Sequence, residues 1–265
     1  MRIYVLHKTT YRFEPPAAYA LQRAHLRPAT NRIQTVVDWS LSVEHGQIEA
    51  SYSDHYDNPT DMIVAERDTD AITFSAEGIV ETRDTAGVLG FETTAMPLWH
   101  YRKQTTRTAP GKRIRALAQP MMRSSDKLSG LHELMHSILD VCSYEKGHTL
   151  SGTTAEEALS TGRGVCQDHA QIFLSVARLA GLPARYVSGY LLTDSAVGHD
   201  ASHAWAEVFL DTLGWIGFDA SNGQCPDARY IRLAVGLDSS EAAPLSGLRM
   251  GSGVESIDVS LLVQQ

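Results

Sequence analysis

Three separate segments of this sequence carry residue types that together perform nucleophilic chemistry. The first is Gly162-Arg-Gly-Val-Cys166-Gln-Asp-His-Ala170, in which two glycines precede the cysteine and an apolar run follows at 172–180. This pattern predicts a helix that begins at Cys166. The N-terminal end of a helix favours a thiolate, the nucleophilic form of cysteine, and its N–H groups hold a developing oxyanion. Cys166 is therefore a candidate nucleophile.

A base and an orienting carboxylate for this cysteine stand downstream. His203 opens a predicted strand at 203–210, and Asp219 ends the next predicted strand, which starts at residue 215. With a turn between these strands, the start of the first lies beside the end of the second. We therefore expect the Nδ1–H of His203 to reach the carboxylate of Asp219. Together with Cys166, these residues predict a catalytic triad of nucleophile, base and orienter.

A second motif competes with this interpretation. Residues 132–136 read His-Glu-Leu-Met-His, which matches the H-E-x-x-H helix of zinc proteases. In that motif two histidines one turn apart bind the metal, and Glu156 or Glu157 would be the third ligand here. An extended zinc-protease motif also requires Gly at 139 and His at 142, where this sequence has Leu139 and Cys142. The cysteine interpretation, with no metal and no cofactor, is preferred, and a zinc metalloprotease is the alternative.

The charge, the cysteine spacing and the apolar runs of the chain argue against several classes of function. The formal net charge of −8 argues against general binding to nucleic acid or to anionic membranes. The three cysteines form no CxxC pair, which disfavours both a disulfide framework and a structural zinc cluster. The N-terminal segment turns polar by His7, too early for a signal peptide, and no run approaches the roughly 18 apolar residues of a membrane helix. These features predict a cytoplasmic enzyme with reduced thiols.

Hydrophobic periodicity divides the chain into three parts. Alternating apolar and polar residues predict an all-β domain over 1–85, a small sandwich whose first strand is expected to stop at Glu14-Pro15-Pro16. Residues 86–110 are predicted to be a connector. Residues 111–265 are predicted to be the catalytic domain, in which several helices precede antiparallel strands. A buried cysteine helix packed on such a sheet is an α+β arrangement.

The segments that carry the candidate triad resemble the transglutaminase-like superfamily, and most closely the bacterial transglutaminase-like cysteine proteases. The quoted cysteine segment contributes to this resemblance, as do Gly181-Leu-Pro-Ala-Arg-Tyr-Val-Ser-Gly-Tyr190, Ser202-His-Ala-Trp-Ala-Glu-Val208 and Gly214-Trp-Ile-Gly-Phe-Asp-Ala-Ser-Asn-Gly223. The resemblance is dense over 160–223 and extends more weakly to an N-terminal β domain. It implies a papain-like α+β core with Cys166 as nucleophile, His203 as base and Asp219 as orienter.

Such a triad performs acyl transfer, and the second acceptor decides the reaction. Water gives hydrolysis of peptide, isopeptide or amide bonds, whereas a lysine amine gives protein cross-linking. The resemblance to prokaryotic members favours hydrolysis, with a peptide or protein as substrate. A non-catalytic peptide-binding module is a further alternative. The second oxyanion donor is not identified by the sequence. Tyr144 is one candidate, and a place for Tyr144 in the core is the competing expectation.

Overall fold

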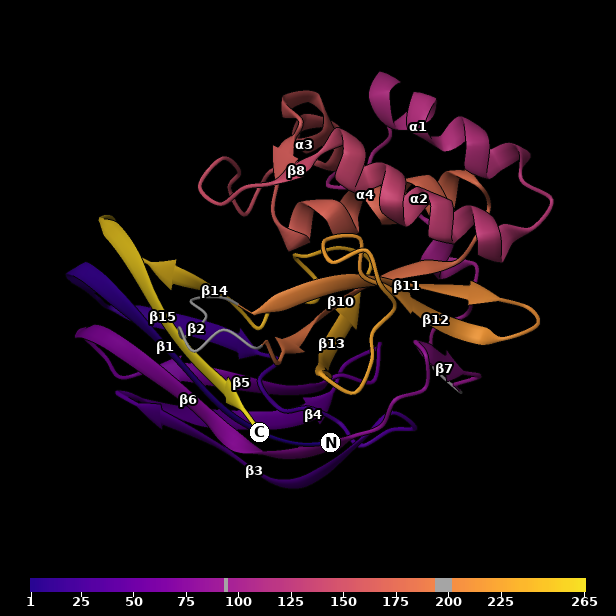
Figure 1. Cartoon of the computed structure of the whole chain (residues 1–265). Helices are drawn as coiled ribbons and strands as arrows, with labels where there is room; N and C mark the ends of the chain where they lie inside the picture. The colour runs from indigo at the N-terminus through magenta and orange to yellow at the C-terminus, as the bar shows by residue number, and fades with distance from the viewer. Residues whose placement is uncertain (93–94, 194–201) are drawn as a thin grey trace.

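Two four-stranded sheets form a sandwich in this structure, a computed structural model that describes residues 1–92, 95–193 and 202–265 (Figure 1). All strand pairs of the sandwich are antiparallel. The first sheet has the order β15 (Val254–Gln264), β1 (Arg2–Ala17), β6 (Thr69–Thr82), β3 (Gln34–Glu44), and the second has the order β14 (Leu245–Met250), β2 (Tyr19–Ala24), β5 (Pro59–Ala65), β4 (Gly46–Ser53).

Strand β1 shows how the alternating sequence forms the sandwich. Tyr11 and Phe13 are buried while Arg12 between them is exposed. Both belong to the apolar cluster that also contains Ile63 of β5, so one face of the strand lines the core between the two sheets. The sequence predicted that this strand would stop at Glu14, but the strand continues through the two prolines to Ala17. Its pairing with β6 is interrupted between Arg12 and Ala17, and a proline, which lacks an N–H, is tolerated where no ladder bond is needed.

The last strands of the chain complete the sandwich. Strand β14 pairs with β2, and β15 pairs with β1 along almost its whole length. The predicted catalytic domain extended to residue 265, whereas the strand pairing places β14 and β15 in the sandwich sheets. Periodicity predicts that a segment is a strand but not which strand lies beside it, which explains the difference.

The second half of the chain forms an α+β layer, as predicted. Its antiparallel sheet has the order β13 (Tyr230–Gly236), β10 (Ala184–Leu191), β11 (His203–Leu210), β12 (Gly214–Phe218), β7 (Val88–Gly90). Figure 1 shows the helices above this sheet and the sandwich below it. The helical elements are η1 (His100–Arg102), α1 (Lys112–Arg123), α2 (Lys127–Val141), α3 (Ala155–Thr161) and α4 (Cys166–Leu179). A short parallel pair, β8 (Ser143–Tyr144) and β9 (Arg163–Gly164), precedes α4.

Helix α4 is the central helix of this layer. Nearly all of its residues are buried, and the Phe173 ring stacks on that of Phe218 in β12 with a centroid separation of 5.2 Å. Burial of a side chain of this size contributes about 1.5–3 kcal/mol to folding. This contact fixes the cysteine helix against the strand that leads directly into Asp219.

The opposite face of the sheet packs against the sandwich. Ile3, Val5 and Val80 of the sandwich form one apolar cluster with Tyr190 of β10 and Ile231 of β13. The two halves therefore share a buried contact. In the described parts of the chain, helices long and apolar enough to cross a membrane are absent.

Candidate active site

Cys166 is the first residue of α4, as the sequence predicted, and only 9% of it is exposed. The turn before the helix is fixed by Asp168, whose Oδ2 accepts hydrogen bonds from the Val165 N–H at 2.9 Å and the Thr149 hydroxyl at 2.7 Å. Burial raises the pKa of the Asp168 carboxyl above its usual value. These contacts hold the cysteine at the N-terminal end of a buried helix, where the helix dipole favours an anion.

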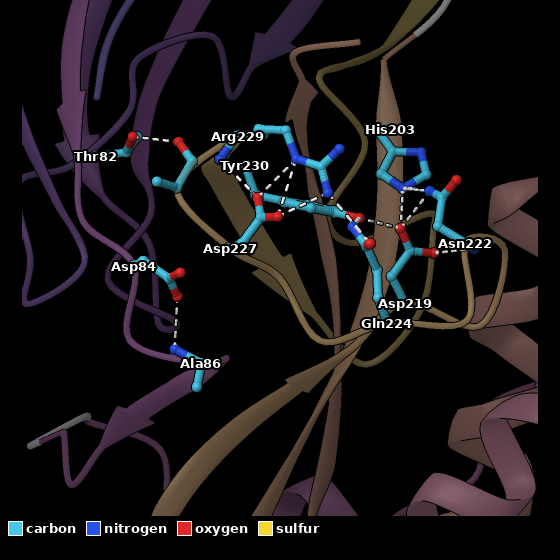
Figure 2. Close-up of polar contacts among 11 residues, drawn as sticks. Thr82, Asp84, Ala86, His203, Asp219, Asn222, Gln224, Asp227, Arg229 and Tyr230 are labelled. Atoms are coloured by element: carbon cyan, nitrogen blue, oxygen red, sulfur yellow. Dashed lines mark hydrogen bonds and ion pairs between the residues drawn. The ribbon is translucent and has the colours of Figure 1, made fainter. Parts of the chain in front are cut away.

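His203 and Asp219 meet because β11 and β12 are paired. Ala206 lies opposite Phe218, so the first residue of β11 lies near the residue that follows β12. The Nε2 atom of His203 lies 2.7 Å from Oδ2 of Asp219 (Figure 2). The sequence argument had assigned this contact to Nδ1, which is wrong, since strand order does not determine how an imidazole ring is turned.

The charge state of His203 depends on both neighbours. Burial of the ring disfavours its protonated form, but hydrogen bonds with Asp219 and Cys166, together with the negative charges of both, raise the pKa of His203 to about 10. The imidazole is consequently an imidazolium at neutral pH. The cysteine at the helix start, an imidazolium and a carboxylate therefore stand in the order that nucleophilic catalysis requires.

Asp219 is held by more donors than the sequence indicated. Its Oδ2 also accepts from the Asn222 side chain at 2.7 Å and from the Tyr230 hydroxyl at 2.7 Å. Its Oδ1 accepts from the backbone N–H groups of Ser221 at 2.9 Å and Asn222 at 3.3 Å. Burial works against the ionised carboxyl, but the hydrogen bonds and the charge of His203 hold the pKa of Asp219 below its usual value. Asp219 is thus a carboxylate at neutral pH.

Sequence reasoning missed Asn222 and Tyr230 as members of this site. Asn222 had a local signal, because an aspartate followed by polar residues forms a tight turn that returns donors to the carboxylate. Tyr230 had no such signal, since it comes from the separate strand β13.

Tyr144 lies at the edge of the site rather than in the core. It is 46% exposed, and β8 places it beside Gly164 of β9, just ahead of the cysteine. Partial burial and the charges of Cys166 and Asp219 raise the pKa of Tyr144 to about 12. The expectation of a core tyrosine is wrong, while its assignment as second oxyanion donor stays a prediction.

The histidines of the competing zinc motif are on α2, beside Gly223 and Gln224 of the loop that follows Asp219. The ring of His132 packs edge-on against Phe218, with centroids 5.4 Å apart. His132 and His136 line a pocket of about 500 Å³ that also contains Cys225. Within the described ranges, no group of three or more His, Cys, Asp or Glu side chains is arranged to hold a metal ion. A catalytic zinc site uses three protein ligands, so the geometry does not favour the metalloprotease alternative.

Comparison with known proteins gives the same fold. The chain is 20% identical to a protein from Cytophaga hutchinsonii described as a "Putative Cysteine Protease", with a TM-score of 0.79 over 100% of this chain and 90% of that one. It is 30% identical to an uncharacterised protein of Mycobacterium leprae, over 97% of this chain and 96% of the relative. An uncharacterised protein of Mycobacterium tuberculosis is 29% identical over 98% of this chain and 91% of its own length.

Family models cover both halves of the molecule. The bacterial transglutaminase-like N-terminal region matches residues 3–81, which form most of the sandwich. The transglutaminase-like superfamily matches residues 115–220, from α1 to the residue after Asp219. The chain therefore belongs to the transglutaminase-like superfamily and carries the N-terminal region of its bacterial members.

Proposed function

We propose that this protein is a cysteine-nucleophile acyl-transfer enzyme that hydrolyses peptide, isopeptide or amide bonds. The observation that carries the proposal is the position of His203, which contacts Asp219 through Nε2 at 2.7 Å and whose pKa is raised by its interactions with Asp219 and Cys166. The superfamily and the cysteine-protease description of the Cytophaga hutchinsonii protein support the same reaction class.

In the first half of the reaction, the Cys166 thiolate attacks the carbonyl carbon of the scissile amide. The carbonyl π electrons move to oxygen, and N–H groups at the start of α4 stabilise this oxyanion. When the tetrahedral intermediate collapses, the C–N bond breaks and the imidazolium of His203 gives its proton to the departing amine. The products are a free amine and a thioester on Cys166.

In the second half, water attacks the thioester. Neutral His203 takes a proton from the water, the C–S bond breaks, and the thiolate and imidazolium are restored with release of a carboxylic acid. Asp219 keeps the ring oriented and stabilises its positive charge in both halves. A lysine amine in place of water would give cross-linking, so the choice of acceptor is a separate part of the test.

The test combines covalent labelling with substrate profiling. Iodoacetamide near neutral pH is expected to modify Cys166 faster than Cys142 and Cys225, and His203→Ala is expected to remove this preference. Mass spectrometry of the three cysteine-containing peptides measures each rate. Equal labelling of the three cysteines in the wild-type protein would contradict the proposal.

Profiling uses peptide amides, an isopeptide and a glutamine peptide with and without an added amine. Cys166→Ala is the blank and Cys225→Ala is the matched control, since Cys225 is a free thiol outside the triad. Release of amine without amine incorporation supports hydrolysis. Incorporation in preference to hydrolysis would support the cross-linking alternative. Binding of an electrophilic peptide without an adduct on Cys166 would support the non-catalytic module.

A further inference from the structure

A line of hydrogen bonds runs outward from Oδ2 of Asp219, the oxygen that also contacts His203 (Figure 2). The Tyr230 hydroxyl donates to Oδ2 of Asp219 at 2.7 Å, and Nε2 of Gln224 donates to that hydroxyl at 2.9 Å. The Arg229 guanidinium then donates to Oε1 of Gln224 at 3.2 Å. Arg229 is held in turn by Asp227, with an N–O separation of 2.7 Å. The inner end of this line, at Tyr230, is shielded from solvent, because Tyr230 is only 2% exposed.

The direction of every bond in this line is fixed by its outer end. A guanidinium only donates, so Arg229 requires Gln224 to present its oxygen. The amide nitrogen of Gln224 must then face Tyr230, where it also only donates. The tyrosine hydroxyl accepts that bond, and its single proton is left for Asp219. Burial and the charge of Asp219 raise the pKa of Tyr230 above its ordinary value, so the hydroxyl retains this proton.

Gln224 is also tied to Asp219 through the backbone. The N–H of Asp219 donates to the Gln224 carbonyl at 2.9 Å, and the N–H of Gln224 donates to the Asp219 carbonyl at 3.2 Å. The loop between them contains Ser221 and Asn222, whose N–H groups bind the Asp219 carboxylate. A shift of Gln224 would consequently move both the backbone and the side-chain donors of Asp219.

The outer end of the line touches the sandwich. The hydroxyl of Thr82, the last residue of β6, donates a hydrogen bond to the carbonyl of Ala228. The N-terminal ammonium of Met1 donates to the Thr82 carbonyl at 2.6 Å. Because Ala228 lies between Asp227 and Arg229, the sandwich fixes the turn from which the guanidinium reaches Gln224.

We propose that Arg229, Gln224 and Tyr230 are positioning residues that keep Asp219 ionised and aligned, and that the sandwich holds their outer end through Thr82. This inference rests on the proposed function, because it assigns these residues a role in supporting the triad. It also gives the N-terminal sandwich a task in catalysis although it contributes no residue to the triad.

The test measures the rate of Cys166 alkylation by iodoacetamide between about pH 3 and pH 9 in the full chain. Tyr230→Phe removes one donor from Asp219, and a carboxylate with fewer donors has a higher pKa. Protonation of Asp219 removes the charge that stabilises the imidazolium beside Cys166, so the acidic midpoint of the rate profile follows the pKa of Asp219. This midpoint should therefore rise by about one pH unit, the size expected for one hydrogen bond to a charged group. Gln224→Leu should shift the midpoint in the same direction, and Thr82→Val should do so by a smaller amount.

Tyr190→Phe is the matched control. It also removes a buried tyrosine hydroxyl with a hydrogen bond, here to Nδ1 of His7 at 2.9 Å, but this hydroxyl lies outside the line. Its thermal stability is expected to fall while its acidic midpoint stays at the wild-type value. This variant separates a positioning effect on Asp219 from general destabilisation.

The two proposals fail in different ways. If wild-type Cys166 reacts no faster than the other cysteines, the proposed function fails. If wild-type Cys166 is selectively reactive but Tyr230→Phe and Gln224→Leu keep its acidic midpoint, the positioning role is wrong. Should Tyr230→Phe not fold, Arg229→Gln tests the same line from its part-exposed end, and an unchanged midpoint there would equally contradict the role.

Discussion

Helices α4 and α2 form an instructive pair, because each carries a sequence motif associated with amide-bond cleavage and each packs on the same sheet. At the start of α4, the sheet supplies His203 to Cys166 and supplies Asp219 to His203. On α2, the ring of His132 packs edge-on against Phe218 of the sheet, with ring centroids 5.4 Å apart. The cysteine segment of α4 thus has a histidine and an aspartate from the sheet beside it, whereas His132 of the α2 motif packs against an apolar ring.

The difference shows that a motif on one helix is only half of a site. A nucleophile needs a base and a base needs an orienter, and in this fold both come from strands that lie far along the chain. The His-Glu-Leu-Met-His segment has two metal-binding residue types at the right spacing. What it lacks, within the described residues, is a third ligand arranged with them.

The largest expected effect is on turnover. Cys166→Ala should lower amide hydrolysis at least about 10⁴-fold, because the covalent route is lost with the nucleophile. The double variant His132→Ala, His136→Ala should retain activity within about threefold, since neither ring contributes to the triad. Steady-state assays on the best substrate from profiling measure both. Loss of activity in the histidine double variant, with its folding intact by circular dichroism, would revive the zinc alternative.

The second largest effect on the rate of hydrolysis is expected for substitution of His203, the proposed base. His203→Ala should slow hydrolysis by about 10²–10⁴-fold, the range typical of general acid–base catalysis. Asp219→Asn should also slow it, because the amide does not carry the charge that stabilises the imidazolium. His136→Ala serves as the comparison on α2 and should be nearly silent. A His203→Ala enzyme with wild-type turnover would sink the assignment of the base.

The pH dependence should separate Cys166 from the other thiols. Burial raises the pKa of Cys142 to about 11 and also raises that of Cys225. Selective alkylation of Cys166 should hence be greatest near neutral pH and shrink as the pH approaches 11. Hydrolysis should fall as the pH rises through about 10, where His203 loses the proton that it gives to the leaving amine.

The same shifts predict where the histidine–aspartate contact stabilises the fold. The pKa of His203 is raised on folding, so its contribution is complete below its unfolded pKa of about 6.5 and is lost as the pH rises through about 10. The pKa of Asp219 is lowered on folding, so its contribution is present above about 3.9 and is lost as the pH falls through the lower folded value. Urea unfolding of wild type and His203→Ala at several pH values checks both limits. Equal stability differences at pH 6 and pH 11 would contradict this account.

The sequence predicted the elements of the site better than the details of its contacts. Local signals were sufficient for the start of α4, because glycines, a cysteine and an apolar run are adjacent in the chain. The antiparallel pairing of β11 with β12 followed from their lengths and the turn between them. The ring nitrogen of His203 that contacts Asp219 was assigned wrongly, because side-chain torsions depend on packing that no local pattern encodes.

Residues that support the site from a distance were the hardest to predict. Tyr230 and Thr82 reach the site region only through the tertiary arrangement of β13 and β6, and their sequence surroundings are ordinary strand patterns. The placement of β14 and β15 in the sandwich has the same origin, since the partner of a strand is chosen by the whole fold. Their pairing makes the N-terminal region and the end of the chain parts of one sandwich.

The smallest expected effect concerns the cap of α2. Oδ1 of Asp126 accepts hydrogen bonds from the Leu128 N–H at 3.1 Å and the Ser129 N–H at 3.3 Å, and so begins the helix. Asp126→Ala should lower the melting temperature by about 2 °C, as for loss of one exposed cap, and leave Cys166 alkylation unchanged. Asp140→Ala is the matched control, because it removes an exposed carboxylate near the C-terminal end of the same helix, where a negative charge is unfavourable. If Asp126→Ala slowed Cys166 alkylation while Asp140→Ala did not, α2 would be coupled to the triad and the contrast between the two helices would need revision.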